Sequence, residues 1–239
     1  MVAAEGRFDY INIVMPVYNE KENIGNTINE INHKINSAHK IIIIYDFEED
    51  NTLPPLKNLM MKQDNIFLLK NKYGRGVLNA IKTGFESVSE GAVLVMMADL
   101  SDDLSIVDEM FARLNQGYDI VCGSRYMKGG KQIGGPVLKK SMSRLAGISL
   151  FFLAGLPTRD ATNSFKMYGA DVLQNIEIES GGGFELGMEI VIKAHQRGYK
   201  ITEVPSIWRD REAGESNFKL WAWLPRYLHW YFYAIIKRS

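Results

Sequence analysis

The chain has 239 residues, 46% of them hydrophobic, and its 28 basic and 28 acidic residues give a formal net charge of zero. This length suits one large domain, or a domain with a small appendage, built around a substantial core. The charge balance argues against a nucleic-acid-binding protein that relies on bulk positive charge. The single cysteine, Cys122, excludes a disulfide framework and is expected to be a small core residue.

Short apolar runs alternate with longer segments of helical periodicity through the first half of the chain. The apolar runs predict strands near 11–17, 41–45, 66–69, 92–97 and 120–123. The segments between them predict helices near 21–35, 53–62, 74–88 and 104–114. Strands separated by helices imply right-handed crossovers. The predicted fold class is therefore α/β, with a Rossmann-like, mainly parallel central sheet flanked by helices and with ligands at the carboxyl ends of the strands.

The first predicted strand ends in Pro16-Val17-Tyr18-Asn19-Glu20, which places a proline, an aromatic ring and a carboxylate where the crevice of such a sheet opens. Tyr18 could cover a nucleotide base there, and Glu20 could accept a hydrogen bond from a base or a ribose. The alternative is a strand exit followed by an ordinary helix cap. This segment alone therefore marks only a candidate nucleotide-binding position.

The fourth predicted strand ends at an acidic cluster. Its apolar run over 92–98 is followed directly by Asp99-Leu100-Ser101-Asp102-Asp103. A buried strand that ends in carboxylates presents hard oxygen ligands at the sheet edge, where a divalent cation and a diphosphate can be held together. The alternative is that these residues only cap the next helix, since Asp and Ser are favoured at helix starts. The pattern makes Asp99 a candidate metal ligand in a nucleotide-sugar site.

Beyond residue 124 the alternation of runs stops. Four glycines and a proline within eight positions favour a mobile loop over a regular element: Gly129, Gly130, Gly134, Gly135 and Pro136. From residue 125 to residue 158 there is no acidic residue, and six residues are basic: Arg125, Lys128, Lys131, Lys139, Lys140 and Arg144. Positive charge concentrated in a neutral chain predicts that an anion, most simply a phosphate, binds here. The alternative is a solvated helix face and loop.

The C-terminal segment 217–239 has no acidic residue and eight aromatic residues: Phe218, Trp221, Trp223, Tyr227, Trp230, Tyr231, Phe232 and Tyr233. With Arg226, Lys237 and Arg238 among them, the segment is predicted to form an amphipathic helix that rests on a membrane surface. A helix packed on the domain, or docked on a membrane partner, explains the same aromatics. The longest nearly apolar stretch, 145–157, has 13 residues, fewer than the roughly 20 that span a bilayer.

Taken in order, these motifs resemble those of an inverting family 2 glycosyltransferase of the GT-A type, in particular dolichol-phosphate mannose synthases and other polyprenyl-phosphate glycosyltransferases. Asp160-Ala161-Thr162-Asn163-Ser164-Phe165-Lys166 resembles a segment written D-x-T-S-G-F-K in relatives. Glu203-Val204-Pro205 with the later Arg211, Gly214, Glu215 and Ser216 resembles an E-V-P…R-x-x-G-E-S signature. The resemblance runs from about residue 11 to residue 221 and implies a GT-A catalytic domain over 1–216, followed by the C-terminal aromatic helix over 217–239.

The resemblance implies a donor site. Positions that match Pro16, Tyr18, Glu20 and Asp46 bind the donor nucleotide in relatives, and the position of Asp99 ligates Mg²⁺ or Mn²⁺ at the diphosphate. Met97 stands at the first acid of this metal motif, so Asp102 or Asp103 are the candidates to compensate for it. The two acids that relatives carry after the second strand appear here as Tyr45-Asp46, and Phe-Glu-Glu-Asp follows at 47–50 instead of a Gly/Ser turn, which leaves the donor base open.

The resemblance also implies an acceptor site and a reaction. Arg211 matches an arginine on a late loop that closes over the diphosphate, so the catalytic residues predicted are Asp99, Arg211 and Arg125. Positions that match Arg125, Lys139 and Ser143 anchor a polyprenyl phosphate in relatives. Such an acceptor carries its own oxyanion as nucleophile and needs little general-base assistance, and no histidine stands in any motif.

The function predicted is transfer of a hexose, most simply mannose from GDP-mannose, to a polyprenyl or dolichyl phosphate with inversion. Alternatives are a UDP-sugar donor, a soluble acceptor, or a nucleotide-binding scaffold without turnover. Expected partners are the nucleotide sugar, the lipid phosphate and a membrane surface, with a membrane protein as a further candidate and no nucleic acid. Because the first ten residues lack the pattern of a secretory signal, a cytoplasmic enzyme is expected, peripheral on the cytoplasmic face of a membrane.

Overall fold

The computed structural model describes residues 6–210 and 220–237. Its central sheet consists of β1 (Ile11–Val17), β2 (His39–Tyr45), β3 (Ile66–Lys70), β4 (Ala92–Val95), β5 (Ile120–Ser124), β7 (Lys166–Gly169) and β8 (Ile201–Pro205). The strands lie in the order β3-β2-β1-β4-β7-β5-β8, and β7 alone among them runs antiparallel to its neighbours β4 and β5. The predicted α/β class with a mainly parallel sheet is confirmed.

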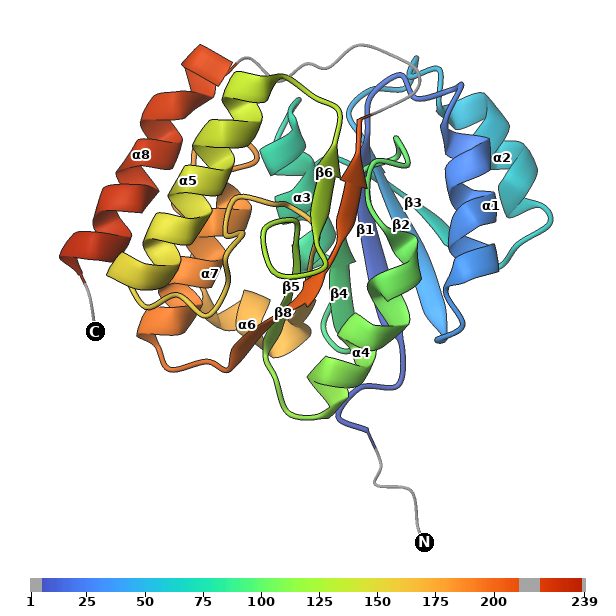
Figure 1. Cartoon of the computed structure of the whole chain (residues 1–239). Helices are drawn as coiled ribbons and strands as arrows, with labels where there is room; N and C mark the ends of the chain where they lie inside the picture. Colours follow the sequence, from blue (N-terminus) through green and yellow to red (C-terminus); the bar gives the residue numbers. More distant parts are fainter. Residues whose placement is uncertain (1–5, 211–219, 238–239) are drawn as a thin grey trace, which may run out of the picture.

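Helices cover both faces of this sheet (Figure 1). They are α1 (Ile24–Lys34), α2 (Leu53–Met60), α3 (Val77–Glu86), α4 (Val107–Asn115), α5 (Val137–Leu153), α6 (Ala170–Asn175), α7 (Leu186–Gln196) and α8 (Leu220–Ile236), with a 3-10 turn η1 (Leu104–Ile106) before α4. The helices predicted over 21–35, 53–62, 74–88 and 104–114 therefore exist, each with ends shifted by a few residues. Such shifts are usual because helix ends fray and their caps depend on local contacts.

The core has two parts because successive side chains of a strand point to opposite faces. Ile13 and Met15 of β1 pack with α1 and α4 residues on one face, whereas Val14 packs with α3 and α7 residues on the other. Gly84 lets α3 approach β1 closely, since a Cβ there would lie 2.4 Å from Val14 Cγ1. Cys122 is fully buried in β5, as expected of a core residue.

The glycine-rich segment after residue 124 is not simply a loop, and this expectation was wrong. It contains β6 (Lys131–Ile133), which pairs in parallel with β9 (Ile207–Arg209). Gly129 and Gly134 have φ values of 95° and 79°, so they form the turns at the two ends of β6. The partner strand lies far along the chain, and local composition therefore could not reveal the pairing.

The C-terminal helix α8 lies beside α5 at one end of the molecule (Figure 1). Trp230 and Ala234 on one side of α8 are buried, and the Trp230 indole donates a hydrogen bond to Ser180 Oγ at 3.0 Å. Leu228, Phe232 and Ile236 on another side are exposed. The helix thus packs on the domain and presents an apolar face as well. No helix in the described parts of the chain is long and apolar enough to cross a membrane.

Candidate active site

Aromatic rings gather where β1 and β2 end. The Tyr18 ring, 49% exposed, meets the Phe47 ring edge-on with centroids 5.6 Å apart. The Arg75 guanidinium lies over the Phe47 ring, 4.6 Å from its centroid. Pro16 is buried in β1 just before Tyr18. The predicted base-covering tyrosine therefore belongs to a stack that the sequence did not reveal, because Phe47 and Arg75 come from different loops.

Asp46 connects this stack to the start of α3. Its Oδ1 accepts from Asn71 Nδ2 at 2.7 Å, and its Oδ2 accepts from the Gly76 backbone N–H at 3.0 Å. Gly76 is the residue before α3 and has a φ of 128°, which glycine adopts readily. The predicted nucleotide-binding carboxylate thus also fixes the loop before α3.

The acidic turn after β2 is built into the scaffold. Asp50 is buried, and its carboxylate accepts from the Asn19 backbone N–H and from both the N–H and the hydroxyl of Thr52. Thr52 Oγ1 in turn accepts from the Glu20 backbone N–H at 2.9 Å. Glu20 Oε2 accepts from Asn23 Nδ2 at 2.8 Å, just before α1. These bonds join the exits of β1 and β2, so the departure from a Gly/Ser turn has a structural reason.

Asp99 lies just past β4, and Asp102 lies beside it. Asp99 is 9% exposed, and its Oδ1 accepts from the Ser101 backbone N–H at 3.1 Å. Burial, the largest effect, and the negative charge of Asp99 raise the pKa of Asp102 to about 7. A hydrogen bond with the Met97 backbone acts in the opposite direction and lowers this pKa. Asp102 Oδ2 is buried without a hydrogen-bond partner. Two carboxylates are therefore held together at the end of β4, one of them incompletely satisfied.

Asp103 has a different role. Its Oδ1 accepts from the Ser105 backbone N–H at 3.2 Å at the start of η1, and its Oδ2 accepts from the Ile207 N–H at 3.2 Å. The capping interpretation of the acidic cluster is correct for Asp103. Since its oxygens are engaged in this way, Asp102 is the better candidate to compensate for Met97.

Arg125 directly follows β5 and forms a bidentate ion pair with Asp160. Nε donates to Asp160 Oδ2 at 2.7 Å and Nη2 donates to Oδ1 at 2.8 Å, with side chains 10% and 0% exposed. Burial lowers the pKa of Arg125, but the charge and hydrogen bonds of Asp160 outweigh it, so the pKa lies above its ordinary value. Arg125 is thus a permanently charged group with a fixed orientation.

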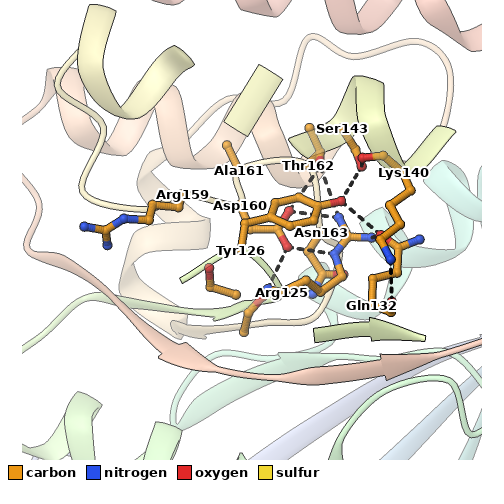
Figure 2. Close-up of polar contacts among 12 residues, drawn as sticks. Arg125, Tyr126, Gln132, Lys140, Ser143, Arg159, Asp160, Ala161, Thr162 and Asn163 are labelled. Atoms are coloured by element: carbon orange, nitrogen blue, oxygen red, sulfur yellow. Dashed lines mark hydrogen bonds and ion pairs between the residues drawn. The ribbon is translucent and has the colours of Figure 1, made fainter. Parts of the chain in front are cut away.

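The Nη1 side of this guanidinium, which Asp160 does not bind, faces a cluster of polar side chains, shown in Figure 2. Arg125 Nη1 lies 3.4 Å from Gln132 Oε1, which also accepts from the Tyr126 hydroxyl at 3.0 Å. The Tyr126 hydroxyl also contacts Ser143 Oγ, and Lys140 Nζ donates to the Gln132 carbonyl at 2.9 Å. The predicted acceptor residues Arg125 and Ser143 are therefore brought together by side chains that the sequence did not single out.

Lys139 stands on α5 four residues before Ser143, which places both on the same face of the helix. Its side chain is half-buried. The other predicted catalytic residue, Arg211, lies outside the described residues, as do Gly214, Glu215 and Ser216 of the late signature. Their roles stay predictions.

Two motif residues hold the loop that positions Asp160. Lys166 is fully buried, burial lowers its pKa, and its ammonium donates to the backbone carbonyls of Ala161 and Asn163. Glu203 on β8 accepts from the Arg159 N–H at 2.7 Å and from Thr158 Oγ1 at 3.2 Å. The charged groups of Lys166 and Glu203 therefore hold the backbone of the loop that carries Asp160.

An aromatic cluster past β1 and β2, paired carboxylates past β4 and a cationic cluster past β5, on a mainly parallel sheet covered by helices, are the features expected of the GT-A fold. Residues 12–177 match the model of the family described as Glycosyl transferase family 2. The chain belongs to this family.

Two curated relatives and one solved structure illustrate what the chain is similar to. It is 28% identical over 214 residues to the "Dolichol-phosphate mannosyltransferase" of Pyrococcus furiosus, covering 87% of this chain and 59% of that protein. It is 27% identical over 211 residues to the "Polyprenol monophosphomannose synthase" of Mycolicibacterium smegmatis, covering 86% of this chain and 79% of the relative. The chain thus spans little more than half of the first relative's length.

The solved structure is a glucosyl-3-phosphoglycerate synthase from Mycobacterium tuberculosis in complex with Mn²⁺, UDP-glucose and phosphoglyceric acid. The TM-score is 0.68 at 14% identity, over 95% of this chain and 80% of that one. At this identity the likeness is one of fold, and it confirms the predicted GT-A architecture.

Proposed function

We propose that this chain transfers a hexose, most simply mannose from GDP-mannose, to a polyprenyl phosphate at a membrane surface. The observation that carries the proposal is the cluster of Arg125, Tyr126, Gln132 and Ser143, which brings a guanidinium of fixed orientation and two hydroxyl groups together past β5. A phosphate monoester matches these donors in charge and geometry. The names of the two curated relatives favour the same acceptor class.

A divalent cation, Mg²⁺ or Mn²⁺, fits the donor set of the acidic site. Asp99 and Asp102 would supply hard carboxylate oxygens, and the buried Asp102 Oδ2 that has no partner is accounted for by a bound cation. No group of three or more metal-ligating side chains occurs in 6–210 and 220–237, so diphosphate oxygens would complete the coordination. When bound, such a cation neutralises charge on a departing diphosphate.

The chain's own groups would then bind and orient the reactants. Arg125, held by Asp160, would bind one phosphate oxygen of the acceptor. The Ser143 and Tyr126 hydroxyls donate to the Lys140 carbonyl and to Gln132 Oε1 in this structure, and they would rotate to donate to the other phosphate oxygens. The remaining phosphate oxygen attacks the anomeric carbon, the new C–O bond forms as the bond to the nucleoside diphosphate breaks, and the configuration inverts. The acceptor oxygen is already ionised, so no general base is required, and the rate gain comes from orientation and charge stabilisation.

Membrane contact would come from the paired helices α5 and α8. Leu138, Leu145 and Phe152 recur every seven residues on α5 and are exposed. Leu228, Phe232 and Ile236 recur every four on α8 and are exposed as well. Exposed apolar stripes of this size on neighbouring helices are typical of interaction surfaces, and the segment around α5 carries only positive charge. We infer a peripheral position on the cytoplasmic face of a membrane.

The test is transfer of labelled sugar from a panel of GDP- and UDP-sugars into an organic-extractable product. Short-chain polyprenyl phosphate and Mg²⁺ or Mn²⁺ are supplied, and the Asp99→Asn variant is compared with the exposed Asp64→Asn as a charge-matched control. We expect metal-dependent lipid product from wild type and Asp64→Asn, and at least a hundredfold less from Asp99→Asn without loss of fold.

Sugar transfer to a soluble acceptor only would contradict the proposal and favour a soluble-acceptor enzyme. Nucleotide binding without any product would contradict it as well and favour an inactive scaffold. The anomeric coupling in the NMR spectrum of the product tests inversion. A retained configuration would rule out the single displacement.

A further inference from the structure

Gln132 stands in the middle of β6 and is the residue of this short strand that faces the protein. Lys131 and Ile133 on either side of it are exposed, as the alternation of side chains along a strand requires. Both ends of β6 are held by β9 and its neighbours. The Lys131 N–H donates to the Ser206 carbonyl at 3.0 Å, and the Ile133 carbonyl accepts from the Asp210 N–H at 3.0 Å. The backbone of Gln132 is therefore fixed, and a movement of this residue would be one of its side chain.

The amide oxygen of Gln132 lies between a cation and a hydroxyl group (Figure 2). Arg125 Nη1 donates to it at 3.4 Å, and the Tyr126 hydroxyl donates to it at 3.0 Å. Gly135, which has a φ of 75°, borders the amide nitrogen, since a Cβ there would lie 3.4 Å from Nε2. Gln132 thus places one neutral acceptor atom on the same donors that an oxygen of a phosphate would use.

The rest of the Arg125 guanidinium is already engaged. Nε and Nη2 donate to the Asp160 carboxylate, and Nη2 also donates to Thr162 Oγ1 at 3.2 Å. A guanidinium has five N–H groups, and two of them belong to Nη1. An anion that binds this guanidinium therefore reaches it through Nη1, the side that Gln132 occupies.

A phosphate is a stronger acceptor for these donors than the amide is. The bond from Arg125 to Gln132 is long, whereas hydrogen bonds between a cationic N–H and an anionic oxygen are about 2.7–2.9 Å. In the absence of an anion, however, the amide oxygen supplies a partner to a guanidinium whose side chain is 10% exposed. A buried donor without a partner is costly, so Gln132 stabilises the unoccupied site.

We propose that Gln132 is a positioning residue that occupies the place of the acceptor phosphate and is displaced when the phosphate binds. Its amide keeps Arg125 and Tyr126 in the orientation that binding requires. Because the displacement costs free energy, the site favours a charged phosphate over a neutral alcohol, which cannot compensate for the bonds lost. The proposal rests on the proposed function, since the phosphate is that of the lipid acceptor.

The experiment measures steady-state transfer to farnesyl phosphate, with Mg²⁺ and a saturating concentration of the nucleotide sugar that the panel selects. Gln132→Met keeps the length of the side chain but has no amide oxygen, so the site is left without its internal acceptor. It should lower the KM for farnesyl phosphate about threefold to tenfold, the worth of one hydrogen bond, with a smaller change in kcat.

Gln132→Glu tests the same competition in the opposite direction. Its carboxylate would pair with Arg125, and this ion pair must be broken before a phosphate binds. The KM for farnesyl phosphate should therefore rise about tenfold or more. Gln116→Glu is the matched control, because Gln116 is exposed and precedes β5, whereas Arg125 follows the carboxyl end of that strand. The KM for the nucleotide sugar should stay within about twofold in all three variants.

A higher KM for farnesyl phosphate in Gln132→Met would overturn the proposal, because Gln132 would then be a direct ligand of the phosphate. An unchanged KM in both variants, or equal effects on acceptor and nucleotide sugar, would overturn it too and leave Gln132 a merely structural residue. If Gln132→Met does not fold, Gln132→Asn takes its place, since the shorter side chain does not extend to Arg125. If the wild type neither binds nor glycosylates farnesyl phosphate, the proposed function itself fails.

Discussion

At the scale of single residues, the charges that matter most are buried ones. Asp160 and Arg125 hold each other with almost no exposure, whereas exposed pairs such as Glu30 with Lys34 are solvated on both sides. An exposed pair contributes little, because water screens it and two long side chains must be ordered. A buried pair is sensitive to the loss of either member, because the other charge is left without compensation.

Asp160→Asn is therefore expected to destabilise the protein by about 3 kcal/mol or more, since the Arg125 guanidinium stays charged in a buried site. Glu30→Gln, which removes the exposed pair on α1, should cost less than about 0.5 kcal/mol. Urea unfolding monitored by circular dichroism measures both. Similar small effects of the two changes would mean that Arg125 turns outward into solvent.

Asp102 and Asp103 are adjacent yet are expected to respond in opposite ways. Asp102→Asn should lower Mn²⁺ affinity about tenfold or more without loss of stability, because it removes a carboxylate that lacks a partner. Asp103→Asn should keep Mn²⁺ affinity and cost about 1 kcal/mol, because it weakens the cap of η1. Mn²⁺ paramagnetic resonance titration and thermal unfolding provide the two readouts.

An exchange of the carboxylate provides the control for this pair. Met97→Asp, combined with Asp102→Asn, restores an acid at the neighbouring position and should recover part of the Mn²⁺ affinity. If the Asp102→Asn variant alone binds Mn²⁺ with unchanged affinity, Asp102 is not a ligand of the cation.

At the scale of elements, a close contact between backbones positions α5 beside the loop of Asp160. Gly147 lies in the middle of α5, where a Cβ would be 2.1 Å from the Arg159 carbonyl oxygen. This contact joins α5, which carries Lys139 and Ser143, to the loop that carries Asp160. Glycine costs helix stability, and here it is needed because no other residue allows so close an approach.

Gly147→Ala should therefore destabilise the protein by about 1–3 kcal/mol, since the added methyl must push α5 away from the loop. Gly25→Ala in α1 has nothing within 4 Å of the added Cβ and should instead stabilise by up to about 1 kcal/mol. Melting temperatures of the two variants test the contrast. Equal changes in the melting temperature of the two variants would mean that α5 does not pack against this loop.

At the scale of the whole molecule, α5 and α8 lie side by side at one end (Figure 1), and each carries a stripe of exposed apolar side chains. Under the proposed function, this arrangement would let a lipid phosphate reach Arg125 while its chain stays near the bilayer. The exposed side chains would enter only the interfacial region, in keeping with the lengths of these helices.

Leu145→Glu and Phe232→Glu are accordingly expected to reduce sedimentation with anionic phospholipid vesicles several-fold, because each places a charge in the apolar interface. Both positions are exposed, so melting temperatures should change little. Phe67→Glu, at an exposed position on β3, is the matched control and should leave vesicle binding intact. Equal vesicle binding by all variants would remove this face as the membrane contact.

The sequence by itself determined the elements of the first half of the chain, the mainly parallel sheet, the family and the positions of Tyr18, Asp46 and Asp99. These follow from local periodicity and from the rule that parallel strands expose their carboxyl ends at one edge, both of which are properties of short segments.

Only the tertiary structure decided which acids are held by distant backbone N–H groups. Asp103 and Asp50 resemble Asp99 in sequence, but distant backbone N–H groups of Ile207 and Asn19 engage them. It likewise decided that β6 is a strand and that its Gln132 contacts Arg125. Burial and hydrogen-bond satisfaction depend on segments that meet only in the folded chain, and no local pattern of residues records them.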